Sequence, residues 1–167
     1  MILVYSGPGK GKTSACLGQA LRALGHGYRV AFGQYIKRDG QAGEQRMLSN
    51  LLGDDFCANG LGFVKNCSDR APHEKAARFL LSWAMGKAHE VWILILDEAL
   101  YALEYGLLTK EDFCELMAFC QKQGCHLVLS GRVAPPWLIM MADMVSTIDS
   151  VKHPFSLGAS AQKGLEY

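Results

Sequence analysis

Residues 1–13 read MILVYSGPGKGKT, an apolar run that continues directly into a glycine-rich loop. The run Met1–Tyr5 has the length and character of a buried β-strand. Leucines then recur at helical spacing, at Leu17, Leu21 and Leu24. A glycine-rich loop between a strand and a helix is the setting in which proteins bind phosphate groups. The stretch therefore predicts a nucleotide-binding α/β domain.

The loop Ser6–Thr13 contains the groups that a triphosphate needs. Its glycines permit backbone angles that turn N–H groups inward as an anion nest, and the helix that starts near Lys12 adds its positive dipole end. Lys12 is expected to reach phosphate oxygens, and the Thr13 hydroxyl to ligate Mg²⁺. The strict pattern G-x-x-x-x-G-K-[ST] requires glycine at position 6, where this chain has Ser6, and Gly7 comes one residue late. The alternative, a chance glycine-rich turn, does not explain why strand, loop, lysine, hydroxyl and helix all agree. The predicted nucleotide-binding residues of the loop are Ser6, Gly7, Pro8, Gly9, Lys10, Gly11, Lys12, Thr13 and Ser14.

The rest of the chain alternates short apolar strands with amphipathic helices. Further strands are expected at Arg29–Tyr35, Val91–Leu96, His126–Ser130 and Met144–Ile148, with a short one near Phe56. Further helices are expected from Pro72 onward, over Asp112–Lys122, and from Pro136 to about Ala142. Continuous apolar strands are typical of a parallel sheet that is covered on both faces. We therefore predict one α/β domain over residues 1–167, P-loop NTPase-like, with a doubly wound, mostly parallel sheet and helices on both faces.

Two carboxylates, Asp97 and Glu98, directly follow the apolar strand Val91–Leu96. In a parallel sheet this places them at the carboxyl edge, beside the phosphate loop. There they could hold Mg²⁺ directly or through water. The alternative for Asp97 is to cap the helix that begins near Ala99. Arg132 follows a later strand at the same edge, where a contact with a ligand or phosphate and a purely structural role are equally open.

The composition excludes several other classes of protein. Half of the 167 residues are apolar and the formal net charge is +1, which is unlike the basic footprint of a general nucleic-acid binder. The longest apolar run is too short to cross a membrane, and the first strand runs straight into the loop, so we expect no signal peptide. The six cysteines form no C-x-x-C pair and no zinc-type cluster. A cytoplasmic protein with reduced cysteines is expected.

The chain as a whole resembles the P-loop type of ATP:corrinoid adenosyltransferase, a family that makes coenzyme B12. The resemblance begins in the phosphate loop and continues in order through short segments to the last residue. The matching segments are 7–13, 23–27, 34–37, Gly43-Glu44, Gly62-Phe63, 96–98, 130–132, Ala142-Asp143, 152–155 and 161–167.

The resemblance implies a particular reaction. Cobalt, reduced to Co(I), attacks the 5′ carbon of ATP and expels triphosphate, which the loop holds in a reversed sense. Lys12 and the loop amides would stabilise the charge of the leaving triphosphate. Thr13 and Glu98 stand at the family's metal positions and would hold Mg²⁺ or Mn²⁺, while Lys10 and Lys37 are further candidates for phosphate or corrinoid contacts. The catalytic residues implied are Lys12, Phe63 and Glu98.

The family presses apolar side chains against the lower face of the corrinoid. Phe63 stands at one of the two aromatic positions that do so, after Gly62, and a core role is its alternative. The second position, tryptophan in many relatives, is Lys65 here. An ammonium cannot form the same water-free apolar surface, because burying it unpaired is costly. Either another residue fills this space, or the enzyme accepts a corrinoid without a bulky lower ligand.

The resemblance also implies partners. The expected ones are a corrinoid acceptor, an electron donor such as a flavoprotein reductase, and a second copy of the chain in a homodimer; no nucleic acid or membrane is expected. Two other functions stay open from the residues: an ordinary P-loop ATPase or phosphotransferase, and a non-catalytic corrinoid carrier that binds ATP. The missing basic N-terminal helix of many relatives and Lys65 are what make the carrier conceivable.

Overall fold

The computed structural model describes residues 1–64, 70–152, 158 and 160–165. Lys65, Cys67 and His153 therefore lie outside the described residues. The elements occur in the order β1 (Ile2–Ser6), α1 (Lys12–Gly25), β2 (Val30–Gln34), α2 (Gly43–Leu52), a single 3₁₀ turn (Gly53–Asp55), β3 (Phe56–Ala58), α3 (Arg70–Lys87), β4 (Ile93–Asp97), α4 (Ala99–Glu104), α5 (Lys110–Gln123), β5 (His126–Ser130), α6 (Pro136–Met141) and β6 (Met144–Thr147).

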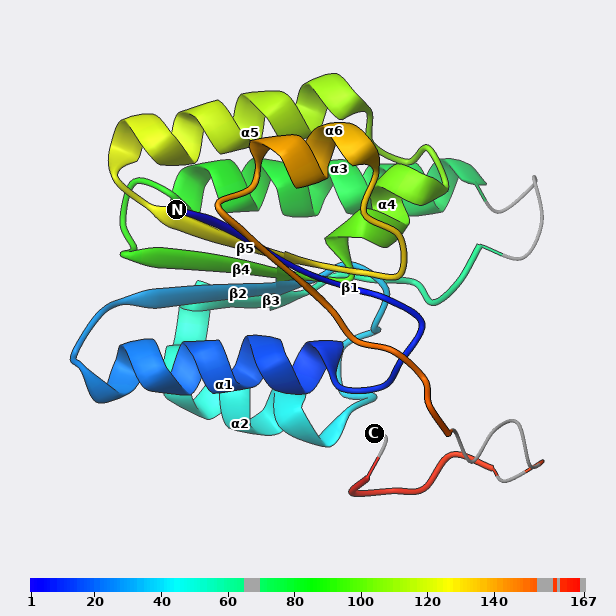
Figure 1. Ribbon diagram of the computed structural model, residues 1–167. Coiled ribbons are helices and arrows are strands. Elements are labelled where there is room, and N and C mark those ends of the chain that lie inside the picture. Colours follow the sequence, from blue (N-terminus) through cyan, green and yellow to red (C-terminus); the bar gives the residue numbers. More distant parts are fainter. Residues whose placement is uncertain (65–69, 153–157, 159, 166–167) are drawn as a thin grey trace.

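A six-stranded sheet in the order β3-β2-β4-β5-β1-β6 forms the middle layer. Every pair of neighbouring strands is parallel. Helices α1 and α2 cover one face, and α3, α4, α5 and α6 lie on the other (Figure 1). The α/β fold with helices on both faces is therefore confirmed, and the sheet is parallel throughout its named strands.

The central strand β4 shows why its sequence is continuously apolar. Ile93 and Ile95 pack into the core beneath α1, whereas Leu94 and Leu96 pack into the core on the opposite face. Alternate residues of a strand point to opposite faces, so a strand covered on both sides has no position for a solvated side chain. Asp97, which ends the strand, is fully buried as well.

The helices differ from the predictions mainly at their ends. Helix α5 begins at Lys110, two residues earlier than predicted, because Thr109 caps it and forms a reciprocal pair of hydrogen bonds with Asp112. Helix α3 is described from Arg70, so Pro72 occupies its first turn, where its missing N–H costs nothing, rather than its first position. Helix α2 was not predicted. In the described part of the chain, no helix is both long and apolar enough to cross a membrane.

Candidate active site

The phosphate loop joins β1 to α1 and packs against the residue that follows β6. Ser6 is the last residue of β1, and its carbonyl accepts a hydrogen bond from the Ile148 N–H (2.7 Å). Gly7 turns the chain with a φ of 115°, and its N–H donates to the Arg132 carbonyl (3.0 Å). Gly9 donates to the Ile148 carbonyl (2.8 Å). A Cβ on Gly7 or Gly9 would lie 2.4 or 2.6 Å from that carbonyl oxygen. The strand thus runs through Ser6, which explains why the first loop glycine comes one residue late.

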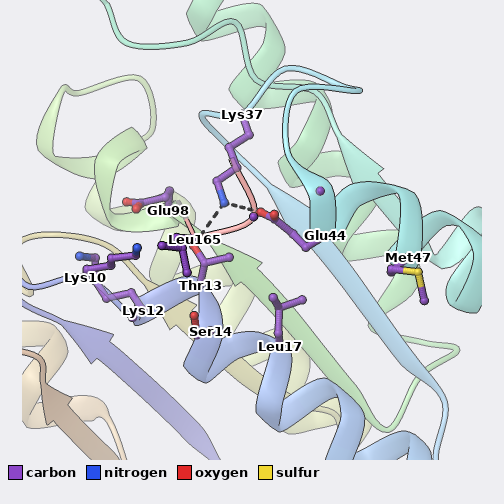
Figure 2. Close-up of a pocket in the computed structure, with 13 residues that line it drawn as sticks. Lys10, Lys12, Thr13, Ser14, Leu17, Lys37, Glu44, Met47, Glu98 and Leu165 are labelled. Atoms are coloured by element: carbon purple, nitrogen blue, oxygen red, sulfur yellow. Dashed lines mark hydrogen bonds and ion pairs between the residues drawn. The ribbon is translucent and has the colours of Figure 1, made fainter. Parts of the chain in front are cut away.

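An anion at this loop would meet the start of α1. The prediction that the loop glycines turn their N–H groups toward an anion is wrong for Gly7 and Gly9, because both N–H groups donate to carbonyls of the protein, and Pro8 has no N–H. The first N–H groups of a helix have no acceptor inside it. Residues Gly11–Ser14 line a cavity of about 590 Å³ at this end of α1 (Figure 2). The Lys12 ammonium is held over the loop by the carbonyls of Gly7 (3.0 Å) and Gly9 (2.8 Å).

The remaining walls of this cavity, which we call the phosphate cavity, come from four separate parts of the chain. Lys37 and Glu44 point toward each other, and Leu165 lines the same cavity as Thr13 (Figure 2). The lining residues besides Gly11–Ser14 are Lys10, Leu17, Lys37, Gly43, Glu44, Met47, Glu98, Gly164 and Leu165.

Asp97 is the buried hub beneath the cavity. Its carboxylate accepts hydrogen bonds from the hydroxyls of Thr13 (3.0 Å) and Ser130 (2.7 Å) and from the Gln34 amide (3.2 Å). A buried carboxylate requires such donors, because an unpartnered charge in the interior is costly. Asp97 therefore orients Thr13 from below and does not cap α4, whose N-cap position is held by Glu98.

Glu98 stands at the cavity itself, in a left-handed backbone conformation with a φ of 57°. Its N–H donates to the Ser130 hydroxyl (2.8 Å), which fixes the turn between β4 and α4. Burial, and then repulsion from the Asp97 carboxylate, raises the pKa of Glu98 above its ordinary value. Left-handed conformations are unusual for residues other than glycine and often occur where a side chain must be placed at a functional site.

Lys37 and Glu44, which both line the phosphate cavity, form an ion pair of 2.5 Å. The same ammonium lies 3.4 Å from the Thr13 hydroxyl and 3.9 Å from the Asp97 carboxylate. Although burial acts to raise the pKa of Glu44, hydrogen bonds from Lys37, the backbone and Gln34, together with the charge of Lys37, lower that pKa overall. Lys37 is thus positioned to exchange a protein carboxylate for a phosphate oxygen.

The donors present fit a magnesium ion. The Thr13 hydroxyl and the Glu98 carboxylate both face the phosphate cavity, with Asp97 behind Thr13. These are the hard oxygen ligands that Mg²⁺ prefers. No group of three metal-binding His, Cys, Asp or Glu side chains occurs among the residues that the structure describes.

A second cavity of about 270 Å³ lies on the other side of Lys12 and Glu98; we call it the acceptor cavity. Lys12 and Glu98 line both cavities. Phe63 is 65% exposed, and its ring packs edge to face on the Tyr101 ring, with 5.4 Å between the ring centroids. The lining residues are Pro8, Lys12, Ile36, Phe63, Glu98, Tyr101, Glu104, Tyr105 and Arg132.

The structure therefore divides the predicted site residues between two cavities. Lys10, Lys12, Thr13, Ser14, Lys37 and Glu98 meet at the phosphate cavity, whereas Pro8, Phe63 and Arg132 lie at the acceptor cavity. The backbone groups of Ser6, Gly7 and Gly9 hold the loop in place through hydrogen bonds. Asp97 holds the Thr13 side chain in place in the same way. Gly62 has a φ of 87° and donates its N–H to the Ile36 carbonyl (2.8 Å), so it positions the backbone beside Phe63. Lys65 is outside the described residues.

Several residues at the two cavities escaped the sequence reasoning. Glu44 belongs to a segment that matches the family, but its role depends on Lys37 reaching it across the cavity. Tyr101 lies on α4 and Tyr105 is the residue that caps the end of this helix, and their spacing of four residues is a signal that both rings lie on one side of it. Leu165 reaches the site from the far end of the chain, which no local pattern reveals.

Comparison with known proteins shows the family of the chain. The family model described as ATP:corrinoid adenosyltransferase BtuR/CobO/CobP matches residues 1–167. The corrinoid adenosyltransferase of Pseudomonas aeruginosa is 34% identical over 100% of this chain and 83% of its own length. That of Escherichia coli K12 is 32% identical, over 100% and 85% respectively. The corrinoid adenosyltransferase CobA of Salmonella typhimurium is 33% identical, also over 100% and 85%.

Solved structures show a related fold. The DNA-packaging ATPase B204 of Sulfolobus Turreted Icosahedral Virus superposes with a TM-score of 0.59 at 16% identity, over 94% of this chain and 78% of that one. The flagellar accessory protein FlaH of Methanocaldococcus jannaschii gives a TM-score of 0.54 at 17% identity, over 87% and 69%. At this level of identity the similarity concerns the fold alone.

Proposed function

The chain belongs to the ATP:corrinoid adenosyltransferase family, and we propose that it transfers the 5′-deoxyadenosyl group of ATP to the Co(I) of a corrinoid, in the biosynthesis or salvage of coenzyme B12. The electron pair of Co(I) forms the bond to the 5′ carbon of ATP. The bond from that carbon to the triphosphate oxygen breaks, and triphosphate leaves with its electron pair.

One observation supports this reaction above others: Lys12 and Glu98 line both cavities. A triphosphate held at the start of α1 in the phosphate cavity and a corrinoid placed over the acceptor cavity would both contact these side chains. The reacting carbon would then lie at the boundary, within reach of the cobalt. Holding two reactants at attack distance can contribute roughly 7–11 kcal/mol to lowering a barrier.

The chain's own groups account for the departure of triphosphate. The Lys12 ammonium and the first N–H groups of α1 are fixed donors placed where negative charge grows on the leaving oxygens. Lys37 adds a second ammonium once it exchanges Glu44 for phosphate. Thr13 and Glu98 would hold a magnesium or manganese ion, which supplies further charge neutralisation on the triphosphate when bound.

Phe63 supports the acceptor half of the reaction. An exposed phenyl ring in the acceptor cavity can pack against the lower face of the corrinoid and keep water and the lower base from the cobalt. Removing axial ligands makes Co(I) easier to form. The electron comes from a separate one-electron donor, such as a reduced flavoprotein. Action as a homodimer and a cytoplasmic location remain predictions.

The test combines the protein, ATP, Mg²⁺ and a chemically reduced corrinoid. Formation of the cobalt–carbon bond is followed by absorption, and the phosphate product is identified by chromatography. We expect alkylated corrinoid and triphosphate in equal amounts. ADP without alkylated corrinoid would instead indicate a phosphotransferase or ATPase. Corrinoid binding without turnover would indicate a carrier.

A further inference from the structure

A hydrogen bond from the backbone to α4 fixes the segment that carries Phe63. The Val64 N–H donates to the Tyr101 hydroxyl at 2.5 Å. Tyr101 is only 6% exposed, whereas Phe63 next to Val64 is 65% exposed. Because the Phe63 ring is exposed, packing in the core does not fix its position. Its position must be fixed by the backbone on either side of it and by the Tyr101 ring, whose centroid lies 5.4 Å from that of Phe63.

The other side of this segment is fastened to the strand end. Gly62 donates its N–H to the Ile36 carbonyl (2.8 Å), and Gly60 donates to the Lys37 carbonyl (3.2 Å). A Cβ at Gly60 would lie 2.2 Å from the Ile36 backbone, so the two backbones are in direct contact. Phe63 therefore lies between two anchors, one on the segment that follows β2 and one on α4.

The α4 anchor is rigid. Ala99, Leu100 and Ala102 of α4 are fully buried, and the helix begins directly after Glu98. The Tyr101 ring also packs on the Tyr105 ring at 4.3 Å. The tyrosine hydroxyl is thus tied to the same short helix that positions Glu98 between the two cavities.

We propose that the Tyr101 hydroxyl is a positioning group that holds Phe63 against the lower face of the corrinoid, and thereby sets how well the enzyme acts on corrinoids that carry a lower base. This inference rests on the proposed function. Tyr101 acts through Phe63 and need not contact the cobalt. Its effect should depend on the acceptor, because only a corrinoid with a lower base requires that base to be displaced.

The central variant is Tyr101→Phe, which keeps the ring and removes the oxygen that accepts the Val64 N–H. We expect kcat with a base-bearing corrinoid to fall about three- to tenfold, the loss typical of one hydrogen bond. With a base-free corrinoid kcat should change less than about twofold, and KM for ATP should not change. In a Phe63→Ala background, Tyr101→Phe should have no further effect. Tyr28→Phe, at the amino edge of the sheet, is the matched control for removing a tyrosine hydroxyl.

A second measurement needs no alkyl transfer. The base-bearing corrinoid is bound in its Co(II) form with ATP, and the electron paramagnetic resonance spectrum reports whether the nitrogen of the lower base is still on the cobalt. We expect the wild-type protein to displace the base and Tyr101→Phe to displace a smaller fraction. Equal losses of kcat with both corrinoids, or equal displacement in wild type and variant, would overturn the inference. If the wild type displaces the base in a Tyr101-dependent way but forms no cobalt–carbon bond, the inference stands and the proposed function fails.

Discussion

At the scale of single residues, the site depends on a contrast between two neighbouring carboxylates. Asp97 is fully buried and accepts hydrogen bonds from two hydroxyls and an amide, so its charge is compensated within the protein. Glu98 faces the boundary of two cavities, and burial together with the charge of Asp97 raises its pKa. One carboxylate therefore organises the site, and the other is available to a ligand.

Lys12→Ala should abolish tight binding of the triphosphate without unfolding the protein. The ammonium donates hydrogen bonds to the loop carbonyls of Gly7 and Gly9 and the side chain is partly exposed, so its loss leaves the core unchanged. Losing a charged hydrogen bond to phosphate predicts at least about a tenfold weaker affinity for ATP. Calorimetry measures the affinity and circular dichroism the melting temperature. Lys122→Ala, on the exposed side of α5, is the control. Unchanged ATP affinity in Lys12→Ala would mean that the loop does not hold the triphosphate.

Glu98→Gln should stabilise the free protein while slowing adenosyl transfer. Below its ordinary pKa of 4.5, Glu98 is protonated in both folded and unfolded chains and does not oppose folding. As the pH rises through the raised folded pKa, the native state must accept a buried negative charge beside Asp97, and stability falls. The variant should therefore melt at the wild-type temperature near pH 4 and above the wild-type temperature at pH 8. Glu115→Gln, exposed on α5, should show no such pH-dependent gain; a gain equal to that of Glu98→Gln would contradict this account.

At the scale of elements, helix ends carry measurable stability. The Thr109 hydroxyl accepts a hydrogen bond from the Asp112 N–H, and the Asp112 carboxylate accepts one from the Thr109 N–H at 2.7 Å. Thr109→Ala breaks this reciprocal cap and should cost about 1 kcal/mol of unfolding free energy. Urea denaturation measures the loss, with Ser82→Ala on the exposed side of α3 as the control. Equal stabilities of the two variants would show that the cap contributes nothing.

The elements also show what the sequence could and could not predict. The strands followed from apolar runs such as Ile93–Leu96, because burial on both faces leaves no polar positions. Helix α2 was missed, since only Gln45 and Leu48 are buried in it and its N-cap, Ala42, offers no capping side chain. The phosphate loop was visible because its chemistry is local. The Asp97 hub was not, because it depends on the strand pairing that sets Gln34 beside Asp97.

At the scale of the whole molecule, the carboxyl edge of the parallel sheet gathers the site from distant parts of the chain. β1 supplies the loop, β2 supplies Gln34, β4 supplies Asp97 and β5 supplies Ser130. The chain then passes β6 and returns toward the start of α1, where its last described residues lie (Figure 1). Loops at this edge of an open α/β sheet are the usual place for a ligand.

The returning segment should contribute to binding but not to folding. Residues 160–165 are exposed, yet Gly164 and Leu165 line the phosphate cavity. Removing residues 160–167 should leave the melting temperature of the free protein unchanged, because the described part of this segment, residues 160–165, is exposed. ATP affinity should fall about tenfold. At an ATP concentration that saturates the wild-type protein, ATP should therefore raise the melting temperature of the truncated chain less than that of the full chain, because stabilisation by a ligand depends on its affinity. Leu165→Ala should show part of this loss, and Leu21→Ala, exposed on α1, should show none. A truncated chain that melts lower without ATP, or binds ATP as the full chain does, would show that the segment serves the fold instead.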